Sequence, residues 1–333
     1  MMSAPILRVT DLTIAFPATR PVSNLSFEVS RGETVAIVGE SGSGKSLTAL
    51  ALMRLLPRSA RINEGRIWFD GQDLGSLREQ EMRKVRGAQL AMIFQEPMTS
   101  LNPVLTIGAQ IIDVLRLHEN LSRQAARARA IELLDLVRVA DPHRRIDDFP
   151  HRLSGGMRQR VMIAIAVACN PRLLIADEPT TALDVTIQAQ VLDLLDGLRR
   201  DLGMGLLLIS HDLGVVGQWA DRVVVMYAGR KVEEGGPDVI LRHPRHPYTA
   251  GLIAASPRTA DGLSYRDGPL REIIGSIASA SGEPGCPFRP RCPTARPACA
   301  VSPPIPVAVG VGHLAACPVL NPEEAARALA SGP

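Results

Sequence analysis

Residues 34–46 read TVAIVGESGSGKS, and this stretch decides the fold. TVAIV is a short apolar run of the kind that forms a buried strand, and GESGSGKS fits the pattern GxxxxGK[ST] between a strand and a helix. Glycines in such a loop let backbone N–H groups close around phosphate oxygens. The sequence therefore predicts a phosphate-binding loop made of Gly39, Glu40, Ser41, Gly42, Ser43, Gly44, Lys45 and Ser46.

A second stretch, LLIADEP at residues 173–179, places two carboxylates at the end of an apolar strand. In a loop of this pattern Lys45 reaches the β and γ phosphates of a nucleotide and Ser46 ligates Mg²⁺. Asp177 is then expected to hold the water shell of the Mg²⁺, and Glu178 to polarise a water for attack on the γ phosphate. A solvated loop is the alternative, which the apolar run before the carboxylates and the proline after them disfavour.

Two further polar residues follow apolar strands. Gln95 comes after LAMIF, and His211 comes after LLLIS. Ligands of open α/β sheets bind at the carboxyl ends of the strands, so both residues are expected on the same edge as Lys45 and Asp177. A lone histidine is more often structural, and the assignment therefore depends on both residues together.

The order of the patterns predicts an α/β fold. Alternating strands and TVAIV are followed by a helical pattern over about residues 103–167, and strand–helix alternation resumes at RLLIAD. After Gly236 the sequence becomes rich in proline and loses its periodicity. We therefore expect a first domain over residues 1–236, with a helical subdomain at about 103–167, and a small C-terminal module over residues 237–333.

Composition narrows the function classes. The chain is 46% hydrophobic and 21% charged, and its net charge is only +3, so no nucleic-acid partner is expected. The longest apolar runs are about half of what a membrane-spanning helix needs. The N-terminus also lacks the basic-then-apolar layout of a secretion signal. We expect a chain that does not cross a membrane by itself.

Residues 153–160, LSGGMRQR, open a further apolar run. Ser154 is suited to an N-cap, and helix N-termini attract phosphate. The lysine of the phosphate loop, however, lies more than a hundred residues upstream. The sequence thus contains a second helix end suited to an anion, without its own phosphate loop.

Taken in order, GESGSGKS, Gln95, LSGGM, LLIADEP, TALD (residues 181–184) and His211 resemble the nucleotide-binding subunit of ABC transporters, over roughly residues 6–255. The resemblance implies a P-loop ABC ATPase cassette, with a RecA-like core, an antiparallel β part and an inserted helical subdomain. In that family two cassettes pack head to tail with ATP between them. It therefore implies that a partner cassette's nucleotide is served by Ser154, Gly155 and Gly156.

The resemblance also implies a role for each remaining motif residue. Glu178 would be the general base, His211 would contact the γ phosphate, and Lys45 would bind it. Mg²⁺ would lie among Ser46, Gln95 and Asp177. Asp184 would lie at the dimer seam, and Phe16 is the nearest candidate for the aromatic ring that stacks on adenine, with a core phenylalanine as the alternative.

The C-terminal stretch HPRHPYTAGLIAASP (residues 243–257), with GCPFRPRCPTARPAC and AACP after it, resembles the tail of oligopeptide/dipeptide (peptide/nickel) transporter ATPases. Paired C-x₂₋₄-C knuckles of the kind found in zinc ribbons are absent from it. Four thiolates in a loop-rich segment are compatible with a [4Fe–4S] cluster, which this tail is understood to carry in some relatives. Zinc or unligated thiols remain the alternatives for Cys286, Cys292, Cys299 and Cys317.

The family resemblance implies an ATP-hydrolysing subunit that energises peptide import by ATP-driven closure of a cassette dimer. Its expected cofactors are ATP and Mg²⁺. Its expected partners are a second cassette, identical or related, two separate transmembrane permease subunits and, indirectly, an extracytoplasmic substrate-binding protein. Its expected place is the cytoplasmic face of the cell membrane, as a peripheral subunit.

Three matters stay open at this level. A soluble ABC-type ATPase that is not coupled to a permease is the first alternative function. A P-loop kinase is the second, although it would leave LSGGM and TALD unexplained. The cargo can be a dipeptide, an oligopeptide, a nickel chelate or glutathione. Residues 96–111, after Gln95, resemble the surface that receives permease coupling helices, with an ordinary connecting loop as the alternative.

Overall fold

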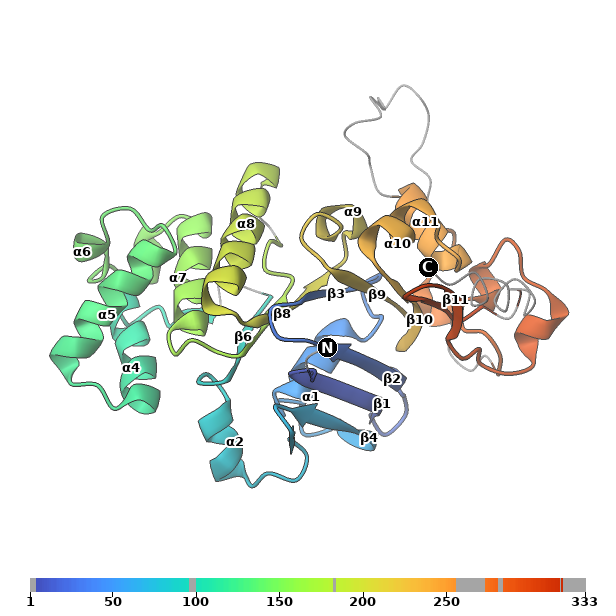
Figure 1. The fold of residues 1–333 in the computed structure, drawn as a ribbon, viewed down its shortest axis with the longest axis horizontal. Coiled ribbons are helices and arrows are strands. Elements are labelled where there is room, and N and C mark those ends of the chain that lie inside the picture. Colours follow the sequence, from blue (N-terminus) through green and yellow to red (C-terminus); the bar gives the residue numbers. More distant parts are fainter. Residues whose placement is uncertain are drawn as a thin grey trace. The chain divides into compact units, whose positions relative to one another are not determined.

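The computed structural model describes residues 4–95, 100–181, 184–255, 273–280, 284–317 and 319 (Figure 1). The chain divides into two compact units, which are described separately. The first unit comprises Met1–Leu7, Glu28–Glu33 and Trp68–Ile209. The second unit comprises Arg8–Phe27, Thr34–Ile67 and Ser210–Pro333.

The second unit contains the predicted strand TVAIV, which is β3 (Thr34–Val38) and is buried along its whole length. It pairs in parallel with β9 (Arg222–Tyr227), and β9 pairs antiparallel with β10 (Arg230–Gly235). Strands in the order β2-β1-β4 form a further sheet. Their bounds are β1 Leu7–Ala15, β2 Val22–Val29 and β4 Arg61–Phe69. The helices of this unit are α1 (Lys45–Leu52), α9 (Leu213–Val216), α10 (Pro237–Arg242) and α11 (Pro247–Ala255).

The first unit is built on three parallel strands, β6 (Leu90–Ile93), β7 (Leu173–Asp177) and β8 (Gly205–Ser210). The short β5 (Gln72–Asp73) pairs with the end of β4 across a turn at Asp70-Gly71. The helices are α2 (Glu79–Val85), α4 (Ile107–Glu119), α5 (Arg123–Leu136), α6 (Pro142–Arg145), α7 (Gly155–Val167) and α8 (Val185–Leu202). The helical pattern predicted over about 103–167 is thus found as α4 to α7.

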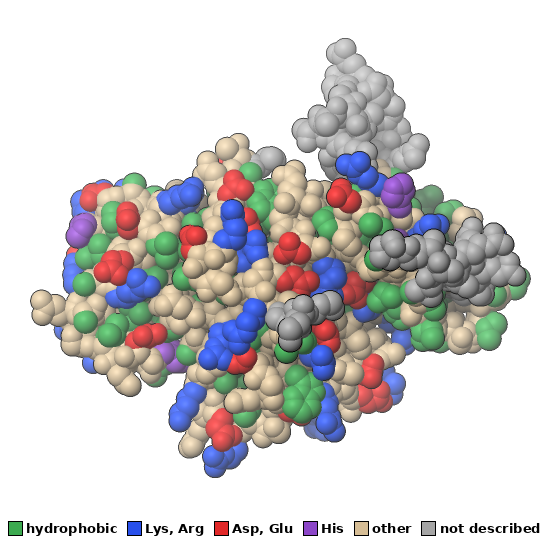
Figure 2. All heavy atoms as spheres, viewed as in Figure 1, with side chains coloured by type: hydrophobic (Ala, Val, Ile, Leu, Met, Phe, Trp, Pro, Cys, Tyr) green, Lys and Arg blue, Asp and Glu red, His purple; other side chains and the backbone are tan. Residues whose placement is uncertain are grey.

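The distribution of charged side chains on the surface agrees with the small net charge of the chain. On the face shown in Figure 2, acidic and basic side chains of the described residues are interspersed, as expected for a net charge of +3. Within the described part of the chain, no helix combines the length and the apolar composition that a membrane crossing requires.

The segment after Gly236 has more regular structure than its sequence indicates. Two short strands, β11 (Val307–Gly310) and β12 (His313–Ala315), pair with each other, and β12 pairs antiparallel with β10. Among the described residues of this segment, 3₁₀ turns are found at Ile277–Ala280, Arg289–Arg291 and Pro297–Ala300. The C-terminal module is therefore joined to the sheet of the second unit by main-chain hydrogen bonds.

A buried carboxylate fastens this junction. Glu233, on β10, is fully buried and accepts hydrogen bonds from the backbone N–H groups of Arg245 (2.6 Å) and His246 (3.0 Å). His313 Nε2 on β12 lies 2.7 Å from Glu233 Oε1. Burial opposes the ionised carboxylate, but the hydrogen bonds from His313 and the two N–H groups outweigh it and hold the pKa of Glu233 below its ordinary value.

His246 is buried beside this carboxylate and must remain neutral. Its Nδ1 accepts a hydrogen bond from the Tyr248 N–H at 3.1 Å, which a protonated ring could not do. Burial outweighs the attraction of Glu233 and lowers the pKa of His246 to about 4. The unfolded chain takes up this proton near pH 6.5, so folding stability falls as the pH drops from there towards 4.

We expect the free energy of unfolding to fall by about 2 kcal/mol between pH 7 and pH 5, since one pKa unit corresponds to about 1.4 kcal/mol. Glu233 titrates below this window and does not contribute to the slope. Denaturant titrations at a series of pH values measure how the free energy of unfolding depends on pH. His246→Gln should flatten the slope, and His143→Gln, at an exposed histidine, should leave it as in the wild type. An unchanged slope in His246→Gln would contradict the assignment.

Candidate functional site

The loop between β3 and α1 has the backbone that the sequence pattern predicts. Gly44, the N-cap of α1, has a left-handed φ of 96°. A Cβ on Gly44 would lie 2.6 Å from the carbonyl oxygen of Pro21, and one on Gly39 would lie 2.2 Å from that of Met226. Glycine is therefore required at both positions, because any side chain would push the loop away from its neighbours.

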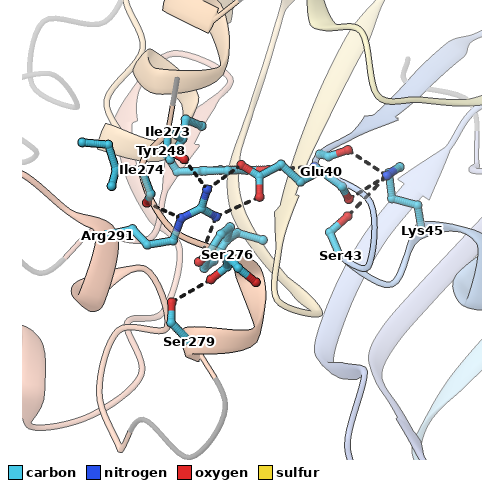
Figure 3. A network of polar contacts seen from close by, with 11 residues as sticks. Glu40, Ser43, Lys45, Tyr248, Ile273, Ile274, Ser276, Ser279 and Arg291 are labelled. Carbon is cyan, nitrogen blue, oxygen red and sulfur yellow. Dashed lines mark hydrogen bonds and ion pairs between the residues drawn. The ribbon is translucent and has the colours of Figure 1, made fainter. Parts of the chain in front are cut away.

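Lys45 curls back into this loop (Figure 3). Its side chain is buried, with 4% exposed, and its Nζ donates to the carbonyl oxygens of Gly39 (2.7 Å) and Glu40 (3.0 Å) and contacts Ser43 Oγ at 3.5 Å. The ammonium group is thus held at the centre of the loop, where a phosphate group would be bound. Ser46 follows on the first turn of α1 and is half-buried.

Two residues of the C-terminal module contact the loop, and the sequence analysis singled out neither of them. The Glu40 N–H donates to the Tyr248 hydroxyl at 2.8 Å, and the Glu40 carboxylate pairs with Arg291 at 2.8 and 3.1 Å. Burial raises the pKa of Tyr248 above its ordinary value, so its hydroxyl stays protonated. Tyr248 and Arg291 lie 208 and 251 positions from Glu40 in the sequence, so no local sequence pattern predicts either contact.

In the first unit, the predicted carboxylate pair is found at the end of β7. Asp177 is buried as the last residue of the strand. Glu178 follows with a left-handed φ of 46°, which is unusual for a residue other than glycine. Its Oε2 accepts hydrogen bonds from Gln95 Nε2 (3.0 Å) and Thr181 Oγ1 (2.9 Å). The predicted meeting of Gln95 with the end of β7 is therefore confirmed.

Two helix N-termini lie next to each other in the same unit. Ser154 caps α7, accepting the Met157 N–H at 3.4 Å, as its place in LSGGM predicts. Asp184 caps α8, accepting the Ile187 N–H at 2.9 Å. A Cβ on Gly156 would lie 3.3 Å from the Ile187 side chain, so the first turns of α7 and α8 are in close contact (Figure 1).

His211 and Phe16 are the remaining residues that the sequence predicts for the site. His211 is exposed directly after β8. Phe16 is half-buried directly after β1, and its N–H donates to the Thr19 carbonyl at 2.8 Å. The common edge predicted for Lys45 and Asp177 would join residues of different units, and it stays a prediction.

A cavity of about 400 Å³ adjoins the phosphate loop at Gly42, inside the second unit. One wall is the turn between β1 and β2, including Arg20, and another is the C-terminal module, including Ile277 and Pro287. Arg20 is among the lining residues and Phe16 is not. The full lining is Ala18, Thr19, Arg20, Pro21, Ser23, Gly42, Ala228, Arg230, Ile277, Ala280, Gly285, Pro287 and Pro303.

The four C-terminal cysteines are free thiols, of which Cys286 and Cys299 are buried. Burial, together with the thiols of Cys299, Cys317 and Cys292, raises the pKa of Cys286 to about 11. Cys292 Sγ lies 3.4 Å from Thr294 Oγ1. Among the described residues, no group of three or more His, Cys, Asp or Glu residues is arranged to hold a metal ion. The predicted metal site is therefore not supported, because the thiols gather without forming a ligand set.

Comparison with known families agrees with the motifs. The family model described as ABC transporter matches residues 22–181. A second one, described as oligopeptide/dipeptide transporter, C-terminal region, matches residues 232–299. The second match starts on β10 and includes Tyr248, Arg291 and three of the four cysteines.

Similar proteins cover almost the whole chain. A protein named peptide import ATP-binding protein from Brucella abortus (strain 2308) is 50% identical over 330 residues, which is 97% of this chain and 98% of that protein. A protein of the same name from Brucella ovis is 49% identical over 331 residues, 95% of this chain and 98% of its own.

Two solved structures show a similar fold. The dimeric post-hydrolysis structure of the ATP-binding cassette MJ0796, bound to ADP and Pi, has a TM-score of 0.62 at 28% identity and covers 69% of this chain and 98% of its own. The structure of cbiO1 from Clostridium perfringens, part of the ABC transporter complex cbiONQ, has a TM-score of 0.62 at 27% identity, covering 73% and 97%. The chain therefore belongs to the ABC transporter family, as an ABC ATPase cassette that carries the C-terminal region of oligopeptide/dipeptide transporters.

Proposed function

We propose that the chain is the ATP-hydrolysing subunit of a peptide importer, which drives transport through separate permease subunits. One observation carries the hydrolytic part: Glu178 follows the buried Asp177 and is fixed by hydrogen bonds from Gln95 and Thr181. The name of the Brucella abortus relative, peptide import ATP-binding protein, supports the cargo class. Dipeptides, oligopeptides and related cargo fit this proposal equally.

In this proposal the phosphate loop binds the β and γ phosphates of ATP. Its backbone N–H groups surround the oxygens, and Lys45 binds them through its ammonium group, which the loop carbonyls hold in position. The hydroxyl, amide and carboxylate oxygens of Ser46, Gln95 and Asp177 are the donor types that Mg²⁺ prefers, so these residues fit it as ligands. Bound Mg²⁺ supplies charge neutralisation at the β and γ oxygens.

Glu178 is proposed as the general base, which takes the proton of the attacking water. The hydrogen bonds that its carboxylate accepts from Gln95 and Thr181 both end on Oε2, and they fix the direction of the carboxylate. His211 is proposed to contact the γ phosphate, as the family resemblance implies. The cavity beside Gly42 suits the base and ribose, with Arg20 able to stack on adenine through its guanidinium plane. The role of Phe16 as the stacking ring remains a proposal without support from this cavity.

The proposed partner is a second cassette, identical or related, packed head to tail. Ser154 and Gly155 are exposed at the start of α7, and with Gly156 they offer N–H groups and a helix dipole to an anion. The anion proposed here is the γ phosphate of ATP bound by the partner, with Asp184 at the seam. The dimeric structure of the similar cassette bound to ADP and Pi supports this arrangement.

A surface of the first unit suits the permease. Val104 is 75% exposed, and Leu105 beside it is also exposed, in the loop before α4. Gln110 holds this loop by donating to the carbonyls of Asn102 (3.1 Å) and Leu105 (3.2 Å). Exposed apolar side chains on a fixed loop favour a protein contact. We propose that two transmembrane permease subunits dock here, on the cytoplasmic face of the membrane, and that a substrate-binding protein delivers cargo to them. Residues 96–99 of the predicted docking segment lie outside the described residues.

Isolation of the tagged chain from its own membranes in mild detergent, followed by mass spectrometry, tests the proposal. Two hydrophobic permease chains and a cassette should be recovered with it. The double variant Val104→Asp/Leu105→Asp should lower permease recovery at least tenfold, because it buries charge in an apolar contact. Leu117→Asp, at a similarly exposed leucine on α4, is the matched control and should leave recovery unchanged. Recovery of ribosomes or nucleic acid alone would favour the uncoupled ATPase.

Glu178→Gln should lower the rate of ATP hydrolysis at least a hundredfold while ATP still binds, because the amide cannot take the proton of water. Phosphate release gives the rate, and size-exclusion chromatography with ATP should show a trapped dimer. Glu132→Gln, an exposed carboxylate of α5 that pairs with Arg129, serves as the control and should hydrolyse ATP like the wild type. An unchanged rate in Glu178→Gln would remove this residue from its role.

The [4Fe–4S] cluster predicted for the four cysteines stays a proposal, and the described residues show no ligand set for it. The thiols of Cys292, Cys299 and Cys317 all lie near enough to Cys286 to raise its pKa. If they hold a cluster, protein prepared without oxygen should be brown and contain about four irons per chain, by the composition of the cluster. Cys286→Ser should lose both colour and iron, and Cys169→Ser should keep them. A colourless protein with bound zinc would reverse the assignment.

A further inference from the structure

Arg291 is a buried cation that joins the C-terminal module to the phosphate loop through Glu40 (Figure 3). Only 4% of its side chain is exposed. Its two terminal nitrogens donate to the two oxygens of the Glu40 carboxylate, at 2.8 and 3.1 Å. This bidentate pairing of a guanidinium with a carboxylate is among the stronger and more directional polar contacts in proteins.

The rest of the guanidinium is anchored within the C-terminal module. Arg291 Nε donates to the Ile274 carbonyl at 3.0 Å, and a terminal nitrogen donates to the Ile273 carbonyl at 2.9 Å. The guanidinium also lies over the Tyr227 ring, 5.7 Å from its centroid. Arg291 is thus fixed on the side of the module and holds Glu40 from there.

Aromatic packing makes this anchor rigid. The ring of Phe288, three residues before Arg291, lies 5.1 Å from that of Tyr227 and 5.4 Å from that of Tyr248. The two tyrosine rings lie 4.6 Å apart. All three residues are buried, so the module has little freedom to shift against the start of the loop.

Glu40 is consequently held at three points. Its carboxylate is held by Arg291, its N–H by the Tyr248 hydroxyl at 2.8 Å, and its carbonyl by Lys45 Nζ at 3.0 Å. The third contact matters most, because the same carbonyl helps to direct the ammonium group of Lys45. Whatever fixes Glu40 therefore also fixes the cation proposed to bind the phosphates.

Charge gives Arg291 a second effect. Glu40 is the second residue of the phosphate loop, and its carboxylate would repel a bound polyphosphate if it were left uncompensated. The guanidinium cancels this charge in a poorly solvated position. The pair is thus neutral towards ATP, while the main chain of Glu40 remains held.

We propose that Arg291 is a positioning residue for ATP binding, through which the C-terminal module sets the shape and the charge of the phosphate loop. The inference rests on the proposed function, in that ATP is taken to bind at this loop. Arg291 itself need not touch the nucleotide. Its action passes through Glu40 to the backbone of the loop and to Lys45.

The test is the equilibrium affinity of the full chain for ATP with Mg²⁺, measured by titration calorimetry. Arg291→Ala should weaken binding about tenfold, since it removes a charged hydrogen-bonded pair and exposes the phosphates to Glu40. Arg291→Lys keeps the charge without the bidentate geometry and should lose less. Arg296→Ala, an exposed arginine of the same module, is the matched control and should bind like the wild type. Circular dichroism checks that each variant is folded.

A second variant separates positioning from mere packing. Adding Glu40→Gln to Arg291→Ala removes the uncompensated charge and should restore part of the lost affinity. Equal affinity of Arg291→Ala and wild type, or a double variant that binds no more tightly than Arg291→Ala, would overturn the inference while the proposed function stands. A wild-type chain that binds no ATP, like Lys45→Ala, would overturn both.

Discussion

The ammonium group of Lys45, buried in the loop that it belongs to, is the constraint on which the site depends. A buried charge is costly unless oxygens surround it, and the carbonyls of Gly39 and Glu40 supply them at 2.7 and 3.0 Å. The loop can bend around the cation only because Gly44 adopts a left-handed φ. An incoming phosphate thus meets a cation whose position is set in advance, and little reorganisation is left to binding.

In the first unit, the group that must be held in place is an anion, the carboxylate of Glu178. Glu178 has a left-handed backbone, a conformation that costs free energy and is concentrated at functional sites. The hydrogen bonds from Gln95 and Thr181, together with the main-chain bond to the Ile209 carbonyl at 2.9 Å, stabilise it. The buried strand end at Asp177 supplies the rigid base from which this turn departs.

Local signals account for what the sequence could predict. The strand TVAIV and the cap at Ser154 each depend on a few neighbouring residues. Glu40 and Arg291 are 251 positions apart, and nothing in either segment marks the other as its partner. Strands as short as β11 and β12 show no alternation that could be recognised, and they form because β12 pairs with β10 and β11 pairs with β12. The spacing of the cysteines is likewise not enough to predict a metal site, because spacing does not fix the direction in which the thiols point.

Two carboxylates, Glu233 and Glu40, attach the C-terminal module to the rest of the second unit. Their surroundings differ, so substitutions at one affect mainly the stability of the fold and substitutions at the other affect mainly the phosphate loop. Glu233 is fully buried, and its hydrogen-bond partners are backbone N–H groups and His313. Replacing Glu233 would therefore leave buried N–H donors without an acceptor, which destabilises the fold. The side chain of Glu40 is 27% exposed, and its main chain is also held by Tyr248 and Lys45. Removing the whole module would break both attachments at once and could not distinguish them. Substitutions at the Glu40–Arg291 pair instead change the charge beside the phosphate loop while β10 and β12 stay joined.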